Sequence, residues 1–445
     1  SDGIVATINK LRVHGFNYGD KSYNQSCGWI TNGPISDGKC ASWGNPTGEM
    51  LYEAMRYYSG VGTASPSYET SGSYDEDIGL TAPAWDDPFA NRGTCADPNV
   101  LLISDISLSY DSDQLPGVYS EFIKSINKDE VYEGTTLPNF SVSDLLSIIS
   151  TNENKTSGQF FIGQSGVDSN GAPTAKEITG LGSVRGLAHA EKKKKGSYSS
   201  SAVAYYGHNN DIHLDKDEKQ NVTTMVVALA STLPEINVNV AGQVVKIIPF
   251  AKSVNGGDSP SESKFQPTNT IVDWYIESIS DTKGIFRINY EDVEQGADHD
   301  MDMIVKYTYE VKSDLCKIYD NNEVCIESGE GVEIKLDSTY AAGGTVQHAG
   351  YIISGTTNDG MYLEVRDHDN NNYRYYLDTP ESSDYRSRKE SGSNEYLGLE
   401  ATRVFFPSNT KAADFLPSPL WYAAKWGGFS DINHNQKPDL ISEWD

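Results

Sequence analysis

An uncharged apolar run that stops in a loop of side-chain oxygens is the feature that most constrains this chain. Residues 100–103, Val-Leu-Leu-Ile, predict a strand that is buried on both faces. The loop after it carries hydroxyl or carboxylate groups at alternate positions, namely Asp105, Ser107, Ser109, Asp111 and Asp113. Ligands of open α/β sheets bind outside the carboxyl ends of the strands, and oxygen ligands suit hard cations. The loop is therefore a candidate site for Ca²⁺ or Mg²⁺; the alternative is a solvated Ser/Asp-rich turn.

The segments around this strand predict helices. Residues 4–13, 44–60, 118–127 and 141–150 all have apolar residues at helical spacing. In the second of these, the predicted apolar stripe consists of Met50, Leu51, Ala54, Met55 and Tyr58, and Gly60 is the predicted stop. Thr47 places a hydroxyl at the start of that helix. Helix, buried strand, acidic loop and helix together make half of a doubly wound α/β domain.

Length and charge limit the classes of protein that this chain can belong to. A chain of 445 residues is too long for one core and predicts two or three domains. The 63 acidic residues against 35 basic ones give a net charge of −28, which argues against nucleic acid and anionic membranes as partners. No apolar run approaches the length of a membrane span. The chain begins Ser-Asp-Gly without Met or a signal peptide, so we expect a processed or trimmed segment.

The five cysteines predict disulfides and not a zinc site, because none has Cys-x-x-Cys spacing. Cys316 and Cys325 flank a turn-like segment and are the best pair, and Cys27 with Cys40 is the second. Cys95 is then unpaired or bonded outside this chain, or it replaces one of Cys27 and Cys40 in their pair. Disulfides indicate an oxidising compartment.

The second half of the chain reads as β structure. Residues 158–166 and 223–230 predict strands, a basic tract at Lys192–Lys195 leads into a helix within 186–211, and residues 236–250 predict a hairpin. The basic tract is either a solvated loop, which we favour, or a contact for an acidic partner. From about residue 268 the pattern predicts antiparallel strands with turns every 8–12 residues, as in a β-sandwich. Val272, Trp274 and Ile276 alternate with polar positions, which predicts a half-buried strand.

Two further acidic segments are candidate cation sites. Asp298, Asp300 and Asp302 lie two residues apart, so a strand would place all three carboxylates on one face; solvation is the favoured interpretation and a cation is the alternative. Near the C-terminus, positions 1, 3, 5, 7 and 9 of a calcium loop are occupied by Asp431, Asn433, Asn435, the carbonyl of Lys437 and Asp439. This loop departs from the pattern at Gln436, where glycine is usual, and at Ser442, because Glu443 comes one residue late. We predict that it binds Ca²⁺ with modest affinity and that the apolar segment 420–426 before it packs on the preceding β domain.

Six segments of the chain carry a family resemblance, namely residues 27–60, the Trp-Asp-Asp-Pro at 85–88, and residues 95–117, 288–304, 350–365 and 420–445. They resemble the PilC/PilY family of type IV pilus tip-associated adhesins. It implies a large exported protein whose N-terminal half holds a von Willebrand A-like domain with further β structure, and whose C-terminal half is a calcium-binding β-propeller. This chain would then be the N-terminal half, ending where the propeller begins. The resemblance also implies minor pilins as partners at the pilus tip, an unidentified receptor on a host or abiotic surface, and export through the periplasm to the cell surface.

The resemblance offers two assignments for a von Willebrand A-like metal site. Such domains use Asp-x-Ser-x-Ser on a first strand, a threonine before a helix and an aspartate after a later strand. Thr47 would be the threonine and Asp105 the late aspartate, with the first-strand motif upstream of Ser1; alternatively, Asp105, Ser107 and Ser109 are the motif itself. The chain order favours the first assignment.

The predicted fold class is α/β plus all-β: a partial, doubly wound von Willebrand A-like domain followed by an antiparallel β-sandwich-like domain. The predicted division is an α/β region at 1–156, a mixed connecting region at 157–255, an antiparallel β domain at 256–416 and a calcium-loop linker at 417–445.

The predicted function is a non-catalytic, calcium-binding adhesin and assembly factor at the tip of type IV pili. A secreted hydrolase is disfavoured, because Gly-x-Ser-x-Gly and His-Glu-x-x-His are both absent from the sequence. The alternative is a structural subunit of an extracellular filament or surface layer.

Overall fold

A computed structural model describes the chain in segments. They are residue 5, 16–17, 22–23, 45–68, 84–90, 97–104, 108–109, 111–112, 114–118, 136–163, 174–185, 196–228, 234–254, 265–266, 270–291, 301–318, 325–342, 346–367 and 398–445. The predicted helices at 4–13 and 118–127 therefore lie outside the described residues, apart from Val5 and Val118, as do Cys27, Cys40, Cys95 and Lys192–Lys195. In the described part, no helix is long and apolar enough to cross a membrane.

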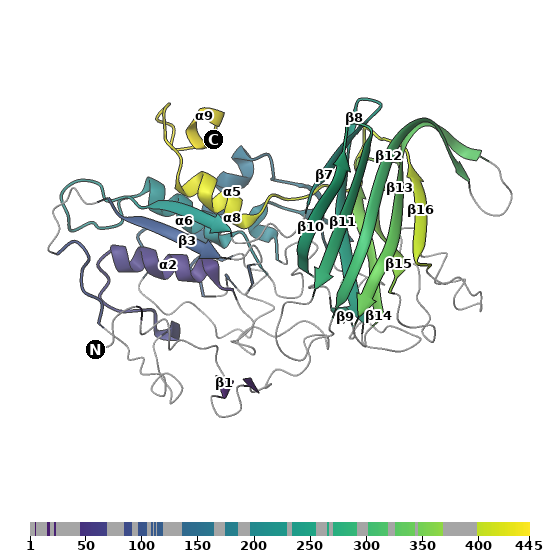
Figure 1. The fold of residues 1–445 in the computed structure, drawn as a ribbon. Helices are drawn as coiled ribbons and strands as arrows, with labels where there is room; N and C mark the ends of the chain where they lie inside the picture. Colours follow the sequence, from purple (N-terminus) through teal and green to yellow (C-terminus); the bar gives the residue numbers. More distant parts are fainter. Residues whose placement is uncertain are drawn as a thin grey trace.

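The first part of the molecule is an α/β unit built on two parallel strands (Figure 1). β3 (Asn99–Ser104) pairs along its length with β6 (Thr223–Ala228). Helices α6 (Ser199–Asn209) and α8 (Pro419–Gly427) contact β6, and α2 (Thr47–Tyr58) contacts β3. A shared apolar core on the helix side of the strands binds the unit together.

The prediction that residues 100–103 are buried on both faces is wrong. Leu101 and Ile103 are 54% and 57% exposed, whereas Val100 packs against the helix-side core. A continuous apolar run indicates a strand with helices on both faces, but the described helices cover only one face here.

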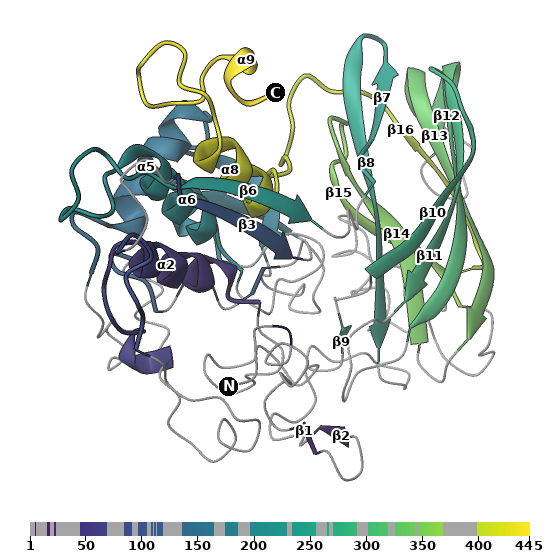
Figure 2. The ribbon, with the colours of Figure 1, turned by 60° about the vertical axis from the view of Figure 1, so that its left-hand side comes forward.

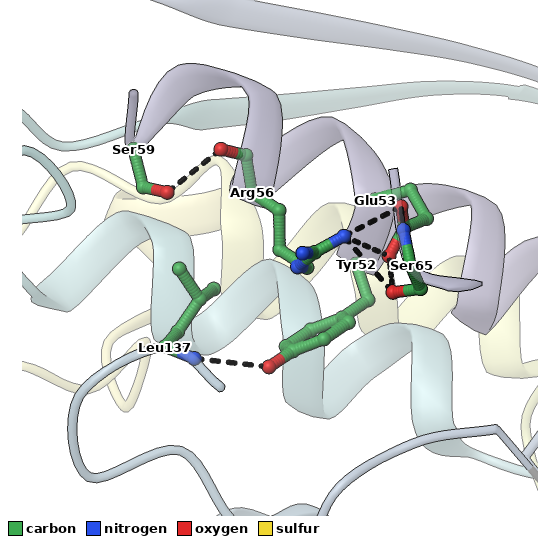
Figure 3. A network of polar contacts seen from close by, with 6 residues as sticks. All are labelled: Tyr52, Glu53, Arg56, Ser59, Ser65 and Leu137. Atoms are coloured by element: carbon green, nitrogen blue, oxygen red, sulfur yellow. Dashed lines mark hydrogen bonds and ion pairs between the residues drawn. The ribbon is translucent and has the colours of Figure 1, made fainter. Parts of the chain in front are cut away.

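Helix α2 confirms the predicted helix and changes its buried face. Leu51 and Met55 are buried as expected, but Met50 is 60% exposed and Tyr52 takes its place in the core. Tyr52 was missed because its ring enters the core while its hydroxyl finds a polar partner, the N–H of Leu137 at 3.1 Å (Figure 3). Gly60 has φ of +78°, a conformation that favours glycine and ends the helix.

A buried ion pair also fixes α2 (Figure 3). Arg56 is 1% exposed, and its Nη1 donates to both carboxylate oxygens of Glu53, at 2.9 and 2.8 Å, and to Ser65 Oγ at 2.9 Å. The N–H of Ser65 donates to Glu53 Oε2 at 2.9 Å. The charges are therefore paired and hydrogen-bonded, as buried charges must be.

The remaining helices pack round α6. Helix α5 (Val142–Asn152) confirms the prediction for 141–150 and begins at Ser141, whose hydroxyl accepts the N–H of Asp144. Residues Ser199 to Gly207 of α6 are all buried. At Gly207 a Cβ would lie 2.7 Å from Met55 Sδ, so a larger residue there would force the Met55 side chain of α2 to move. Two 3₁₀ turns, η3 (Pro66–Tyr68) and η5 (Leu181–Ser183), are also described.

The second part is an antiparallel β-sandwich, as predicted (Figure 2). One sheet has the order β10 (Thr270–Ile279), β11 (Lys283–Glu291), β12 (Asp302–Ile318), β13 (Cys325–Ala342) and β16 (Glu400–Phe405). The other has the order β15 (Gly360–Arg366), β14 (Val346–Ser354), β8 (Gln243–Val254) and β7 (Ile236–Val240), with β9 (Phe265–Gln266) paired to β8. Apolar side chains from both sheets fill the core between them.

The β7–β8 hairpin confirms the hairpin predicted from the sequence, whereas the edge strand β10 differs from its predicted burial. The hairpin turns at Ala241 and Gly242, which both have positive φ. In β10, Val272, Trp274 and Ile276 are each at least 40% exposed, so this strand is not half-buried as predicted. It lies at the end of its sheet, where the opposite sheet covers it less than the central strands.

A smaller apolar cluster joins the two parts. Phe161 of β4 (Gly158–Gly163), which pairs with β5 (Thr174–Ile178), meets the sandwich side chains Phe250, Ile352 and Leu363. The segment after β16 runs beside β4, since the N–H of Phe161 donates to the carbonyl of Asp414 at 3.1 Å. The sandwich is therefore packed against the α/β unit on the outer face of its β8–β14–β15 sheet.

The C-terminal segment returns to the α/β unit. Tyr422, Ala423 and Trp426 of α8 belong to the core formed with α6, not to the sandwich core. The prediction that segment 420–426 packs on the preceding β domain is therefore wrong: its apolar face completes the first core. The predicted domain division at 156, 255 and 416 stays a prediction.

The Cys316–Cys325 disulfide is confirmed, with a Cα–Cα distance of 5.6 Å. It joins the ends of β12 and β13. Two short strands near the N-terminus, β1 (Phe16–Asn17) and β2 (Ser22–Tyr23), pair with each other.

Candidate metal-binding loop

The loop between α8 and the short helix α9 (Ile441–Trp444) holds the five predicted calcium-loop positions in a closed turn. Asp431 accepts the N–H groups of Asn435 and Gln436 on its two carboxylate oxygens, each at 3.0 Å. Asn433 Oδ1 accepts the N–H of Asn435 at 3.2 Å, and Asn435 Oδ1 accepts the N–H of Lys437 at 2.9 Å. Side chains at alternate positions thus fold back on the backbone, which curls the loop around them.

Asp439 closes the turn from the other side. Its two oxygens accept the side-chain amides of Asn433 and Asn435, both at 2.8 Å. The Asn433 amide is the main cause that keeps the pKa of Asp439 below its usual value. The structure therefore brings together the side chains of Asp431, Asn433, Asn435 and Asp439.

This donor set is chemically suited to a hard divalent cation. It offers two carboxylates and two amide oxygens, and the Lys437 carbonyl lies in the same turn. A cation bound by these groups would compete with the amide–Asp439 bonds. Among the described residues, no group of three or more His, Cys, Asp and Glu lies together in a metal-site arrangement, so amide and carbonyl oxygens would have to complete the set.

Backbone conformation shows the cost of the departure at Gln436. Gln436 and His434 have φ of +63° and +59°, in the left-handed region where glycine is favoured. The loop adopts the turn without glycine, at a cost in backbone strain.

Glu443 is the residue of this loop that sequence reasoning undervalued. It is 3% exposed, its Oε1 accepts the N–H groups of Ile432 and Asn433 at 3.0 and 3.4 Å, and its Oε2 accepts the N–H of Leu440 at 3.0 Å. The N–H of Ser430 donates to its carbonyl at 2.8 Å. Glu443 therefore holds the base of the loop closed from one position beyond the usual ligand position.

Aromatic and charged contacts attach the loop to the α/β unit. Lys425 Nζ lies 5.2 Å from the ring centroid of Trp421 and 4.7 Å from that of Trp444, and pairs with Glu153 at 2.7 Å. His208 of α6 lies against the Phe429 ring, at 4.3 Å between centroids, and burial lowers the pKa of that histidine. Both ends of the loop are thus fixed to α6 and α8.

The second candidate set, after β3, is described only at Thr47, Ser109 and Asp111. Asn45, which belongs to no sequence motif, connects two of them: Thr47 Oγ1 donates to Asn45 Oδ1 at 2.9 Å, and the N–H of Asn45 donates to Ser109 Oγ at 2.8 Å. The Asn45 side chain also donates to Ser104 at the end of β3, at 2.9 Å. Asp105, Ser107 and Asp113 lie outside the described residues.

Asp111 is fully buried at the N-terminus of α6. Its Oδ1 accepts the N–H of Ser197 at 2.9 Å, and within the described part of the chain neither its Oδ2 nor Ser200 Oγ has a hydrogen-bond partner. Burial raises the pKa of Asp111 to about 7, against the opposing effects of Ser197 and Arg185. Thr47 and Ser109 therefore hydrogen-bond to Asn45, whereas Asp111 hydrogen-bonds at the N-terminus of α6.

The third candidate set is described only at Asp302, in β12. Its N–H donates to the side-chain oxygen of Gln347 at 2.9 Å. Asp298 and Asp300 lie outside the described residues.

Fold and site together define a two-part protein, an α/β unit joined to an antiparallel β-sandwich, with oxygen-rich loops on the α/β unit. Residues 1–207 match the family model described as "PilY1 homolog, second domain", and residues 238–395 match "PilY1 homolog, beta-sandwich". The chain belongs to the PilY1 family.

A curated relative gives the scale of the similarity. The type IV pilus biogenesis factor PilY1 homolog of Xylella fastidiosa (strain Temecula1 / ATCC 700964) is 38% identical to this chain over 484 aligned residues. The alignment covers 99% of this chain and 31% of the relative, so the chain spans about a third of the relative's length. No solved structure matches the chain.

Proposed function

We propose that this chain is part of a type IV pilus biogenesis factor that acts without catalysis, as an adhesin and assembly factor at the pilus tip. The observation that carries the proposal is the 38% identity, over 99% of this chain, to a protein named as a type IV pilus biogenesis factor. In this proposal the partners are minor pilins and a receptor on a host or abiotic surface, and the location is the cell surface or pilus tip. The Cys316–Cys325 disulfide supports passage through an oxidising compartment such as the periplasm.

Electron microscopy of gold-labelled native pili tests the location. One label at a fibre end supports a tip protein. A regular repeat along the fibre would instead favour the alternative, a structural subunit of an extracellular filament. A panel of peptide, ester and glycan substrates tests the non-catalytic part, because turnover that Asp105→Ala or Asp431→Ala abolishes would make the protein an enzyme.

Within this function, the loop Asp431 to Asp439 is proposed to bind Ca²⁺. Support comes from the convergence of Asp431, Asn433, Asn435 and Asp439 and from the anchoring of the loop by Glu443. A von Willebrand A-like site for Mg²⁺ or Ca²⁺ around Thr47 and the Asp105–Asp113 segment is a second, weaker proposal, and Asp298, Asp300 and Asp302 are a third.

Hydrogen exchange in calcium and in chelator tests the calcium proposal. Extracellular calcium modules bind at about 10⁻⁴–10⁻³ M, so a few millimolar Ca²⁺ should stabilise the closed loop by roughly 1–2 kcal/mol. Peptides covering 428–440 should exchange faster in chelator, and Asp431→Ala with Asp439→Ala should reproduce this in calcium. Asp215→Ala with Asp217→Ala removes two carboxylates from another exposed loop and is the matched control. Exchange that is indifferent to calcium would make the loop a self-closed polar turn.

A further inference from the structure

The parallel strands β3 and β6 present an uncharged apolar face away from their helices. Leu101 lies opposite Met225 in the register and Ile103 opposite Val227. Met225 and Val227 are 47% and 46% exposed, similar to their partners on β3. Neither strand contains a charged residue, in a chain where 22% of residues are charged. These four side chains are called the β3–β6 face below.

This face is unusual for a parallel sheet. Parallel strands occur almost only with both faces covered, because their crossover connections place helices on each side. Here Val100 and Val226 pack against the helix-side core, and α2, α6 and α8 contact these strands (Figure 2). In the described part, β3 and β6 pair with no other strand, so the layer has one open face and two open edges. An exposed apolar surface on strands that carry no charged residue favours association with another surface.

We propose that the β3–β6 face is covered by an amphipathic helix of another domain, the one that precedes the second domain in PilY1-family proteins. Two observations favour this occupant over a second copy of the chain. Residues 1–207 match a model described as the second domain, and the relative's chain is about three times longer than the matched part. The net charge of −28 opposes close association of two copies. The inference rests on family membership and is independent of the calcium and adhesin proposals.

A binding experiment in solution tests this proposal. The probe is the segment of the Xylella fastidiosa relative that precedes its matched region, produced separately and titrated into the 445-residue chain by calorimetry. We expect saturable binding that Leu101→Gln with Met225→Gln weakens at least tenfold. Val244→Gln with Ile279→Gln changes two similarly exposed apolar residues on the sandwich strands β8 and β10, and should leave binding unchanged.

Three further results would each overturn the proposal. The first is absence of binding, or binding that the Leu101/Met225 variant leaves intact. The second is a dimer of the 445-residue chain, by light scattering, that this variant dissociates, because the occupant is then a second copy. The third is a fall of several degrees in the melting temperature of the chain caused by the variant alone, because residues of this chain then already cover the face.

Discussion

Replacing Glu443 by alanine should open the candidate metal loop while leaving the rest of the protein folded. The Glu443 carboxylate accepts three backbone N–H groups, from Ile432, Asn433 and Leu440. A hydrogen bond to a charged group contributes roughly 1.5–3 kcal/mol net. One of the three is long and the loop is accessible to water, so we expect a loss of about 2–4 kcal/mol in the free energy that keeps the loop closed. A loss of 1.4 kcal/mol changes an equilibrium tenfold, so the open population should rise by roughly 30- to 1,000-fold.

Hydrogen exchange resolved to single amides measures this opening. Protection of the Ile432, Asn433 and Leu440 amides should fall by that factor in Glu443→Ala, and by less in Glu443→Gln, which retains one acceptor oxygen. Glu400→Ala removes a carboxylate that pairs with Lys335 on the surface, and should change loop protection little. The reasoning is refuted if protection in Glu443→Ala equals that of the unmodified chain. It is equally refuted if protection falls uniformly through α6 and the sandwich, because Glu443 would then support the whole fold and not the loop.

Three further predictions concern stability. Gln436→Gly should stabilise the loop by up to about 1 kcal/mol, because it relieves the positive φ at that residue; loop exchange in this variant against Gln436→Ala measures the gain, and faster exchange in the glycine variant would contradict it. Arg56→Met should lower the free energy of unfolding by about 3–5 kcal/mol, because it leaves the Glu53 carboxylate without its buried partner. Urea unfolding measures this loss, and the double variant Glu53→Gln with Arg56→Met should recover part of it. If the losses of the two single variants simply add in the double variant, the pairing is contradicted. Cys316→Ser with Cys325→Ser should cost roughly 2–3 kcal/mol, because the bridge closes a loop of about ten residues; thermal unfolding with and without reductant measures it, and no difference between the two conditions would show that the bridge does not form.

Local patterns in the sequence predicted the elements better than their surroundings. The β7–β8 hairpin, α2 and α5 were predictable because alternation, helical spacing and stop residues act within a few positions. The open face of β3 was not, because an apolar run is equally compatible with one covered face and with two. The exposure of Trp274 and Ile276 depends on the place of β10 at the edge of its sheet, which the strand's own residues do not encode.

In the candidate site, too, local spacing was predictable from the sequence and contacts made by the fold were not. The spacing from Asp431 to Asp439 identified side chains that the structure brings together. Glu443 departed from the motif, and its role depends on the return of α9 to the loop base. Asn45 had no motif at all, since its partners Thr47 and Ser109 become neighbours only in the fold. The packing of α8 on α6 could not be predicted from either segment, because they lie more than 200 positions apart in the chain.

The return of α8 to the first core also determines how the molecule would carry a mechanical load. The chain leaves the α/β unit after β6, forms the sandwich from β7 to β16, and re-enters the same core at α8. A pull applied between β3 and α9 would therefore act across the helix packing of α2, α6 and α8. The sandwich lies outside that line of force, attached at the side through Phe161 and its apolar partners. Stretching would strain the α8 contacts with Tyr205 and Glu153 first, while the sandwich stays folded.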